Sequence, residues 1–131
     1  MAALAVELPW PPTVNTYYRH VGPRVLISRE GRRFRERIVA LMRGCRRLEG
    51  AVCLTGDFFP PDRRRRDLDN VAGKALLDAL KYAGAYADDS QVKRMVLQMR
   101  EPMPPDGACY LKLEEMDEHD EAECSHADER R

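Results

Sequence analysis

The sequence lacks the cysteine spacing and the apolar leader that define several classes of small protein. Its four cysteines include no CxxC pair, so neither a zinc finger nor a secreted disulfide framework is indicated. No long apolar run opens the chain, so the pattern of a secretory signal peptide is missing. We therefore expect a cytoplasmic protein with reduced thiols. The cysteines are Cys45, Cys53, Cys109 and Cys124.

Two common ligand-binding loops are also missing. An EF-hand counted from Asp67 would place Ala72 where that loop requires glycine. The dipeptide Gly73-Lys74 does not belong to a P-loop, because Leu68 replaces the upstream glycine and no Ser or Thr follows the lysine. Calcium and nucleotide sites of these two kinds are thereby excluded.

The net charge of the 131 residues is zero, yet the charges are segregated. Residues 19–66 hold 14 arginines and 5 acidic residues, a local charge of +9, which suits a polyanionic partner. Residues 114–131 hold 9 acidic residues and 2 arginines, a local charge of −7. The length fits one domain. We expect a folded domain over residues 1–116 and a disordered acidic tail over residues 117–131.

The acidic tail carries metal-binding side chains at His119, Cys124 and His126. Their spacing fits no known zinc finger and does not favour a metal site. One hypothesis is that the acids after Met116 fold onto the basic half of the chain and compete with its partner. A solubilising, disordered end is the simpler interpretation.

Hydrophobic periodicity predicts an α/β (α+β) fold with two main helices packed on a mixed β-sheet, in the order β-α-β-α-β-β. Prolines predict an extended loop over residues 9–20, and the sequence EPMPPDG predicts a hairpin connection between the last two strands. The expected strands cover residues 4–8, 51–59, 91–100 and 109–116, and the expected helices cover residues 29–48 and about 71–80, with Gly84 as the stop.

An abrupt change of charge marks the stretch PPDRRRRDLDNVAGKALLDAL. Four arginines, Arg63 to Arg66, are followed at once by Asp67 and Asp69. Side chains at positions i and i+2 of an extended chain point the same way, so we expect both carboxylates on one side. Asn70 is then a candidate N-cap for the helix that follows.

A second acidic pair, Asp88 and Asp89, lies between this helix and the next strand. Two strand ends joined by one helix can lie side by side, which would bring Asp67, Asp69 and one of the second pair together. Converging carboxylates repel one another unless a divalent cation neutralises them. Their oxygens suit Mg²⁺, with Mn²⁺ as a substitute, and nearby arginines would hold a phosphate backbone against the metal.

Each of these features also has a simpler interpretation. The arginine run is compatible with a solvated turn or a localisation signal. Asp67 and Asp69 can pair with those arginines or cap the helix, and Asp88 and Asp89 are typical of a turn. The combination favours a metal-dependent nuclease, and a nucleic-acid-binding protein without catalysis is the alternative.

Four motifs resemble the RusA family of Holliday-junction resolvases. They are LPWPPTVNTYYRH, DRRRRDLDN, KALLDAL and ADDSQV, in the family's order and at nearly its spacing. The resemblance implies Mg²⁺-dependent cutting of four-way DNA junctions by a homodimer, as in bacteria and their phages, and so a nucleoid-associated protein. It places the family's catalytic, metal-binding acids on Asp67, Asp69 and Asp89.

The family's catalytic lysine falls on Lys74, but the chain departs from the pattern here. The lysine usually follows the Asp-Asn pair by three positions and here follows Asn70 by four, with Gly73 as the extra residue. Glycine inside a helix costs about 1 kcal/mol relative to alanine. We therefore expect a local bulge or a later helix start.

Charged and aromatic side chains are the candidates for DNA contacts. Arginines bind phosphates and tyrosines stack on bases. The arginines of the first helix are further candidates, with a plain solvated face as the alternative interpretation. A packing role is the alternative for both tyrosines. The candidates are Tyr17, Tyr18, Arg19, Arg63, Arg64, Arg65 and Arg66.

Overall fold

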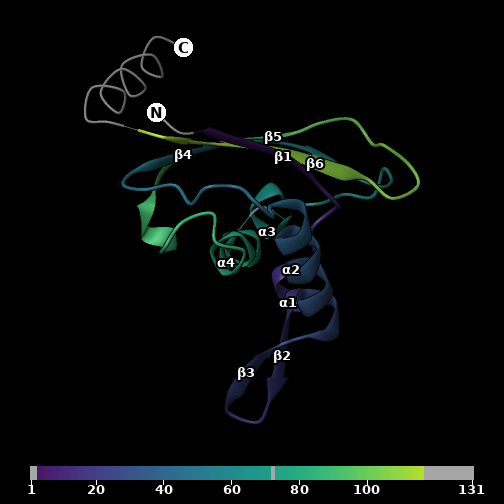
Figure 1. Cartoon of the computed structure of the whole chain (residues 1–131). Coiled ribbons are helices and arrows are strands. Elements are labelled where there is room, and N and C mark those ends of the chain that lie inside the picture. Colours follow the sequence, from purple (N-terminus) through teal and green to yellow (C-terminus); the bar gives the residue numbers. More distant parts are fainter. Residues whose placement is uncertain (1–2, 72, 117–131) are drawn as a thin grey trace.

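A computed structural model describes residues 3–71 and 73–116. A four-stranded mixed sheet carries helices on one face, and a two-stranded hairpin stands apart from it (Figure 1). The prediction of an α+β domain with two main helices on a mixed sheet is confirmed. The elements are β1 (Ala3–Leu8), α1 (Val14–Tyr17), β2 (Tyr18–Val21), β3 (Arg24–Ile27), α2 (Arg29–Leu41), β4 (Val52–Phe59), α3 (Leu68–Val71), α4 (Lys74–Tyr82), the 3₁₀ turn η1 (Asp89–Gln91), β5 (Val92–Met99) and β6 (Ala108–Glu115).

The strand order of the main sheet is β1-β6-β4-β5. Strands β4 and β5 run parallel, and the other neighbours run antiparallel. The predicted hairpin between the last two strands is therefore wrong, because β6 lies between β1 and β4. Burial explains this placement. Cys109, Leu111 and Leu113 of β6 are buried, as suits an inner strand, whereas β5 exposes Met95 and Val96 and forms an edge.

Helix α2 packs an apolar stripe that includes Ile38 against the rest of the domain. The Ser28 hydroxyl accepts a hydrogen bond from the Gly31 N–H at 3.0 Å and so caps the first turn. The helix ends at Leu41, earlier than predicted. Gly44 follows with a φ of 84°, a left-handed conformation that turns the chain away from the helix axis.

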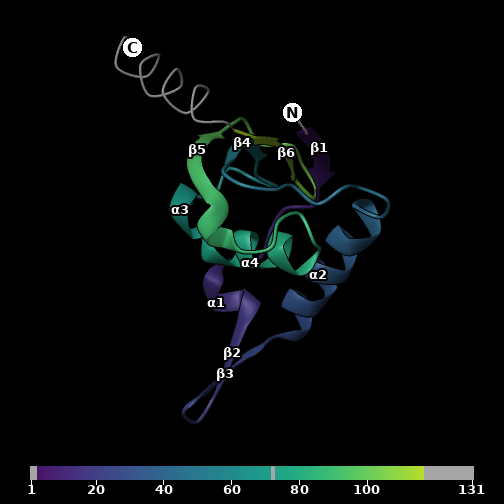
Figure 2. The ribbon, with the colours of Figure 1, turned by 60° about the vertical axis from the view of Figure 1, so that its left-hand side comes forward.

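The extended loop predicted for residues 9–20 is only partly correct. The prolines end at Pro12, and beyond them the chain forms α1 and then the β2–β3 hairpin. The hairpin turn contains Gly22 with a φ of 59°. Figures 1 and 2 show the hairpin extending away from the sheet, and Val21 and Val25 on it are 41% and 58% exposed.

Three of the predicted reduced cysteines lie in the described part of the chain, where Cys45, Cys53 and Cys109 form no disulfide. Burial raises the pKa of the Cys109 thiol to about 12. No helix within residues 3–71 and 73–116 is long and apolar enough to cross a bilayer. The predicted acidic tail, including Cys124 and its neighbouring histidines, lies outside the described residues.

Candidate functional site

The arginine run follows shortly after the end of β4, and contacts fix the orientation of its last residue, Arg66. The Arg66 guanidinium and the Arg64 N–H each donate a hydrogen bond to the Asp62 carboxylate at 2.8 Å. These bonds, that from Arg66 foremost, lower the pKa of the Asp62 carboxyl to about 2. The Arg66 guanidinium also lies over the Trp10 ring, 5.7 Å from its centroid. The three arginines before it are exposed, so solvent-facing cations stand beside one cation of fixed orientation.

The short helix α3 changes the geometry expected for Asp67 and Asp69. The chain becomes helical at Leu68, and the Asp67 carbonyl accepts a hydrogen bond from the Asn70 N–H at 3.2 Å. The exposed Asp67 lies just before this helix and the exposed Asp69 is its second residue, so the stretch is not the continuous extended chain that was expected. Asn70 lies inside this turn, and its predicted N-cap role is therefore wrong.

A break at Gly73 separates α3 from α4. A Cβ atom at Gly73 would lie 2.5 Å from the Asp69 carbonyl oxygen, which is too close for any side chain. Glycine is therefore what allows α4 to begin at Lys74, directly after the turn that carries Asp69. The predicted later helix start is confirmed, and it leaves the exposed Lys74 side chain in the first turn of α4.

The second acidic pair divides into two roles. The Asp88 carboxylate accepts a hydrogen bond from the Ser90 N–H at 3.1 Å and forms an ion pair with Lys81 Nζ at 3.1 Å. The Gln91 side chain accepts from the Asp88 N–H at 3.0 Å and completes a capping box. Hydrogen bonds from Ser90 and Lys81 lower the pKa of Asp88 to about 2. Asp89 takes no part in this box.

Asp67 follows a segment that contacts the carboxyl end of β4. Its neighbour Arg66 covers the Trp10 ring, and that ring meets the Phe58 ring edge-on, with the centroids 6.3 Å apart. Phe58 is the penultimate residue of β4. Asp69 follows in α3, which contacts β5.

Asp89 lies at the amino end of β4 and β5. It opens η1, where Gln91 Nε2 donates a hydrogen bond to the Gly50 carbonyl at 2.9 Å, just before β4 begins. Strands β4 and β5 have eight residues each, which extend on the order of 25 Å at about 3.3 Å per residue. In Figure 1 the green turn before β5 lies below the sheet at the left, and α3 lies below the middle of the sheet.

The three predicted metal ligands are consequently not assembled within one chain. In the described ranges, no three His, Cys, Asp or Glu side chains are close enough to hold a metal ion. The expectation that Asp67, Asp69 and Asp89 meet because one helix joins their strands is wrong for this topology. Parallel strands are joined by a crossover, and a crossover connects opposite ends of the two strands.

Tyr17 and Tyr18 pack at the base of the hairpin. Tyr17 is fully buried, and its hydroxyl accepts a hydrogen bond from Arg35 Nε at 2.8 Å. The Tyr18 hydroxyl donates to the Asp78 carboxylate. Burial is the main cause that raises the pKa of both hydroxyls. These contacts favour the packing role for Tyr17, whereas Arg19 is exposed.

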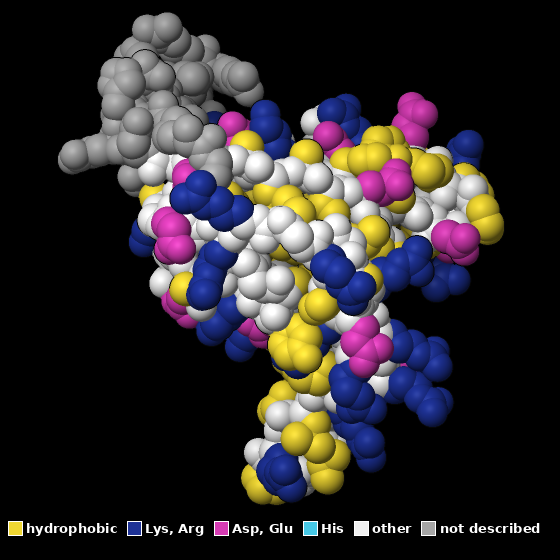
Figure 3. Space-filling view, viewed as in Figure 1, with side chains coloured by type: hydrophobic (Ala, Val, Ile, Leu, Met, Phe, Trp, Pro, Cys, Tyr) yellow, Lys and Arg dark blue, Asp and Glu magenta, His cyan; other side chains and the backbone are white. Residues whose placement is uncertain are grey.

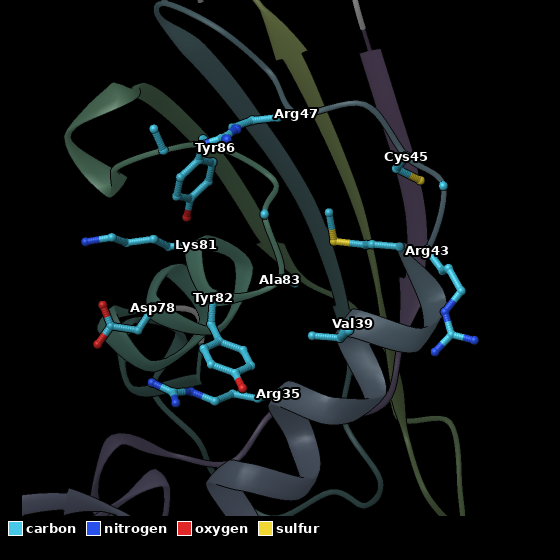
Figure 4. A pocket seen from close by; sticks show the side chains of 14 residues that line it. Arg35, Val39, Arg43, Cys45, Arg47, Asp78, Lys81, Tyr82, Ala83 and Tyr86 are labelled. Atoms are coloured by element: carbon cyan, nitrogen blue, oxygen red, sulfur yellow. The ribbon is translucent and has the colours of Figure 1, made fainter.

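A hollow of about 810 Å³ lies between α2 and α4, and Figure 4 shows the side chains around it. The Arg35 guanidinium carbon is 4.2 Å from the Tyr82 ring centroid at its rim. Lys81 and Tyr82 were not among the predicted site residues, although both follow Asp78 at the i, i+3 and i+4 spacing of one helix face. Figure 3 shows Lys and Arg side chains gathered along α2. The cationic lining consists of Arg35, Arg43, Arg47 and Lys81.

Comparisons with known proteins place the chain in a family. The sequence profile described as Endodeoxyribonuclease RusA matches residues 9–106. The chain belongs to the RusA family of endodeoxyribonucleases. It is 41% identical over 115 residues to the crossover junction endodeoxyribonuclease of Enterobacteria phage 82, which covers 85% of this chain and 93% of that protein. It is 39% identical over 120 residues to the Shigella sonnei protein of the same name, which covers 88% and 98% of the two chains.

Family membership confirms the resemblance drawn from the four motifs. The RusA match spans the arginine run, both acidic pairs and Lys74. Nucleases of this family are typically metal-dependent. Both acidic pairs therefore belong to the part of the chain that matches the family.

Proposed function

We propose that this RusA-family endodeoxyribonuclease resolves four-way (Holliday) junctions in DNA recombination and repair by paired nicks from a homodimer. The observation that carries the proposal is the family match over residues 9–106. Relatives 41% and 39% identical are named crossover junction endodeoxyribonucleases. A junction offers two equivalent strands, and a two-fold dimer supplies two equivalent sites from one short chain. In bacterial or phage-infected cells the substrate would be nucleoid DNA in the cytoplasm.

Asp67, Asp69 and Asp89 are the proposed catalytic and metal-binding residues. Carboxylate oxygens are donors that Mg²⁺ and Mn²⁺ prefer, so the chemistry of this set fits, although one described chain does not bring the three together. A metal bound there would polarise the phosphodiester and lower the pKa of water. The capping box supports Asp89 over Asp88, because Asp88 already serves η1.

Lys74 is the proposed catalytic lysine. Its side chain is exposed in the first turn of α4, and the break at Gly73 keeps it next to the turn that carries Asp69. An ammonium group at this place would stabilise the negative charge that develops on the phosphate during cutting.

The exposed arginines of the run and Arg19 are the proposed phosphate contacts. Arg66 differs from them, because Asp62 and Trp10 fix its orientation. The partly exposed Tyr18 stays a candidate for stacking, whereas the burial of Tyr17 leaves no ring face for a base.

A nucleic-acid-binding protein without catalysis is the second candidate. One observation favours it: within residues 3–71 and 73–116 of one chain no three-carboxylate group is formed. In that case Asp67 and Asp69 would only organise the neighbouring arginines for DNA binding.

The two functions separate in one assay. Purified protein is incubated with a synthetic four-way junction and Mg²⁺, with EDTA in parallel, and with linear duplexes that have the sequences of the arms. A resolvase yields symmetric nicks in the junction only when the metal is present. Junction DNA that is retarded on a gel but stays intact with Mg²⁺ and with Mn²⁺ would favour the binding protein.

A further inference from the structure

The hollow between α2 and α4 carries two cations that no carboxylate of the described chain neutralises. Arg43 and Arg47 are exposed at its edge, and within residues 3–71 and 73–116 neither forms an ion pair (Figure 4). The other two cations of the lining are engaged, because Lys81 pairs with Asp88 and Arg35 lies over a tyrosine ring. The edge formed by Arg43 and Arg47 therefore suits an anionic ligand.

Backbone contacts fix the segment that carries these two arginines. After α2 the chain returns to the segment that follows α4, where the Leu48 N–H donates a hydrogen bond to the Ala85 carbonyl at 2.9 Å. Leu48 and Tyr86 also form a parallel bridge. The segment is thus held at α2 on one side and at Tyr86 on the other, so the two guanidinium groups project from a fixed wall of the hollow.

The described chain ends beside this wall. The Met116 N–H donates a hydrogen bond to the Ala51 carbonyl at 2.7 Å, and the Glu49 N–H donates to the Glu115 carboxylate at 2.7 Å. Arg47 precedes Ala51 by four residues, so their Cα atoms are at most about 15 Å apart at 3.8 Å per residue. The acidic tail over residues 117–131 extends at most about 3.3–3.6 Å per residue, which is enough to cross the hollow.

The charge of the acidic tail is opposite to that of the hollow. Residues 117–131 hold seven acidic residues and two arginines, a net charge of 2 − 7 = −5, and five of the acids lie in residues 117–123. The lining of the hollow has four cations and Asp78, a net charge of 4 − 1 = +3. The arginine run is the other basic candidate, but it follows the carboxyl end of β4, whereas Met116 lies at the amino end. Proximity therefore favours the hollow.

We propose that the acidic tail of the chain binds in its own hollow between α2 and α4, with tail carboxylates on Arg43 and Arg47. The ligand of this site is a carboxylate-rich peptide that the same chain supplies. A bound tail neutralises the edge of the hollow and keeps DNA phosphates away from it. The inference goes beyond the proposed function, since the family match ends at residue 106 and junction cutting plays no part in the contact.

Two native cysteines can report on this contact. Cys45 is exposed and lines the hollow, and Cys124 belongs to the acidic tail, whereas Cys53 and Cys109 are buried. A short bismaleimide is added to the reduced, full-length protein at low salt, and the linked peptides are identified by mass spectrometry. We expect a link between Cys45 and Cys124 in a product with the mass of one chain. Cys124→Ser should abolish it.

Charge reversal separates a bound tail from chance encounters. Arg43→Glu combined with Arg47→Glu should lower the yield of the link by roughly fivefold, the scale expected when two exposed ion pairs are lost. Arg33→Glu combined with Arg37→Glu is the matched control. These two arginines are exposed on the opposite side of α2, so the same change of charge should leave the yield unchanged. Circular dichroism checks that both double variants fold.

Changing the five acids of residues 117–123 to their amides is an independent test, because it leaves the folded domain untouched. This variant should lose the link to the same extent as the reversal of Arg43 and Arg47. Equal yields in wild type, the amide variant and both double variants would overturn the proposal, since the link would then reflect chance encounters.

Two further results would assign the hollow or the tail to another partner. A linked product with twice the mass of one chain would show that the tail lies on a second copy, and would overturn binding within one chain. Binding of a linear DNA duplex is measured by fluorescence anisotropy on the same variants. If reversal of Arg43 and Arg47 weakens DNA binding and leaves the link unchanged, DNA occupies the hollow and the proposal is overturned. None of these measurements requires cutting, so their failure leaves the proposed function standing.

Discussion

Asp67 precedes and Asp69 lies within a four-residue helical turn that is followed by Gly73, whereas Asp88 caps and Asp89 opens a 3₁₀ turn fastened by a capping box and an ion pair. Both carboxylates of the first pair are exposed. In the second pair Asp88 holds the turn together and Asp89 stays outside the capping box. Asp67, Asp69 and Asp89 are therefore free of a capping role, whereas Asp88 stabilises the turn that Asp89 opens.

The largest effect is expected at the available carboxylates. Asp69→Asn and Asp89→Asn should each lower the rate of junction cutting by about a thousandfold, on the scale seen when one polar group is removed from a catalytic centre. Junction binding should be retained, because the arginines are unchanged. Gel-based cutting assays with Mg²⁺ and electrophoretic mobility shifts measure the two properties on the same DNA. Robust cutting by either variant would contradict the roles assigned to the acidic pairs.

The matched substitution Asp88→Asn should behave differently. It removes the negative charge that pairs with Lys81 and should lower the midpoint of thermal unfolding, while cutting changes only a few-fold. The pKa of Asp88 is lowered from 3.8 to about 2, so its contribution to stability is present above the unfolded value and is lost as the pH falls through about 2. The difference in midpoint between wild type and variant should shrink over that pH range. Loss of cutting as severe as in Asp89→Asn would show that the pair does not divide as described.

Gly73→Ala tests the turn of the first pair. A Cβ atom there would lie 2.5 Å from the Asp69 carbonyl oxygen, so the turn must shift, at a cost of about 1–3 kcal/mol in unfolding free energy. Cutting should fall further than stability alone explains, because Asp69 and Lys74 flank the break. Gly44→Ala is the control: its φ of 84° makes alanine unfavourable by about 1–2 kcal/mol, far from the carboxylates. Equal cutting by the two variants would argue against a role for this break.

The smallest effect concerns the arginine run. Arg65→Ala should leave the unfolding midpoint unchanged and reduce the slope of log affinity against log salt by about 1, as expected for one lost phosphate contact. Arg66→Ala should in addition destabilise the fold, because it removes the partner of Asp62 and Trp10. Affinity measured over a salt series, together with thermal unfolding, distinguishes the exposed arginines from the held one.

Local patterns in the sequence predicted the main helices and the strands of the sheet well. The stripe from Val71 to Leu80 and the stop at Gly84 identified the second helix, because burial of one face and the left-handed φ of glycine are local properties. The hairpin over residues 18–27 was missed, because prolines before it suggested continuous loop. Asn70 was misplaced, since whether a residue caps a helix or lies within one depends on where the chain turns.

The family, the identity of the acids and the charge contrast between Arg66 and Asp67 follow from residue types at fixed spacing, so they could be predicted from the sequence. Which strands are neighbours, and therefore where Asp89 lies, depends on contacts between distant segments. Parallel pairing of β4 and β5 is a contact between distant segments, and it sets Asp89, just before β5, beside the start of β4. Strand β5 lies at an edge of the sheet, because the more apolar β6 occupies the inner position between β1 and β4.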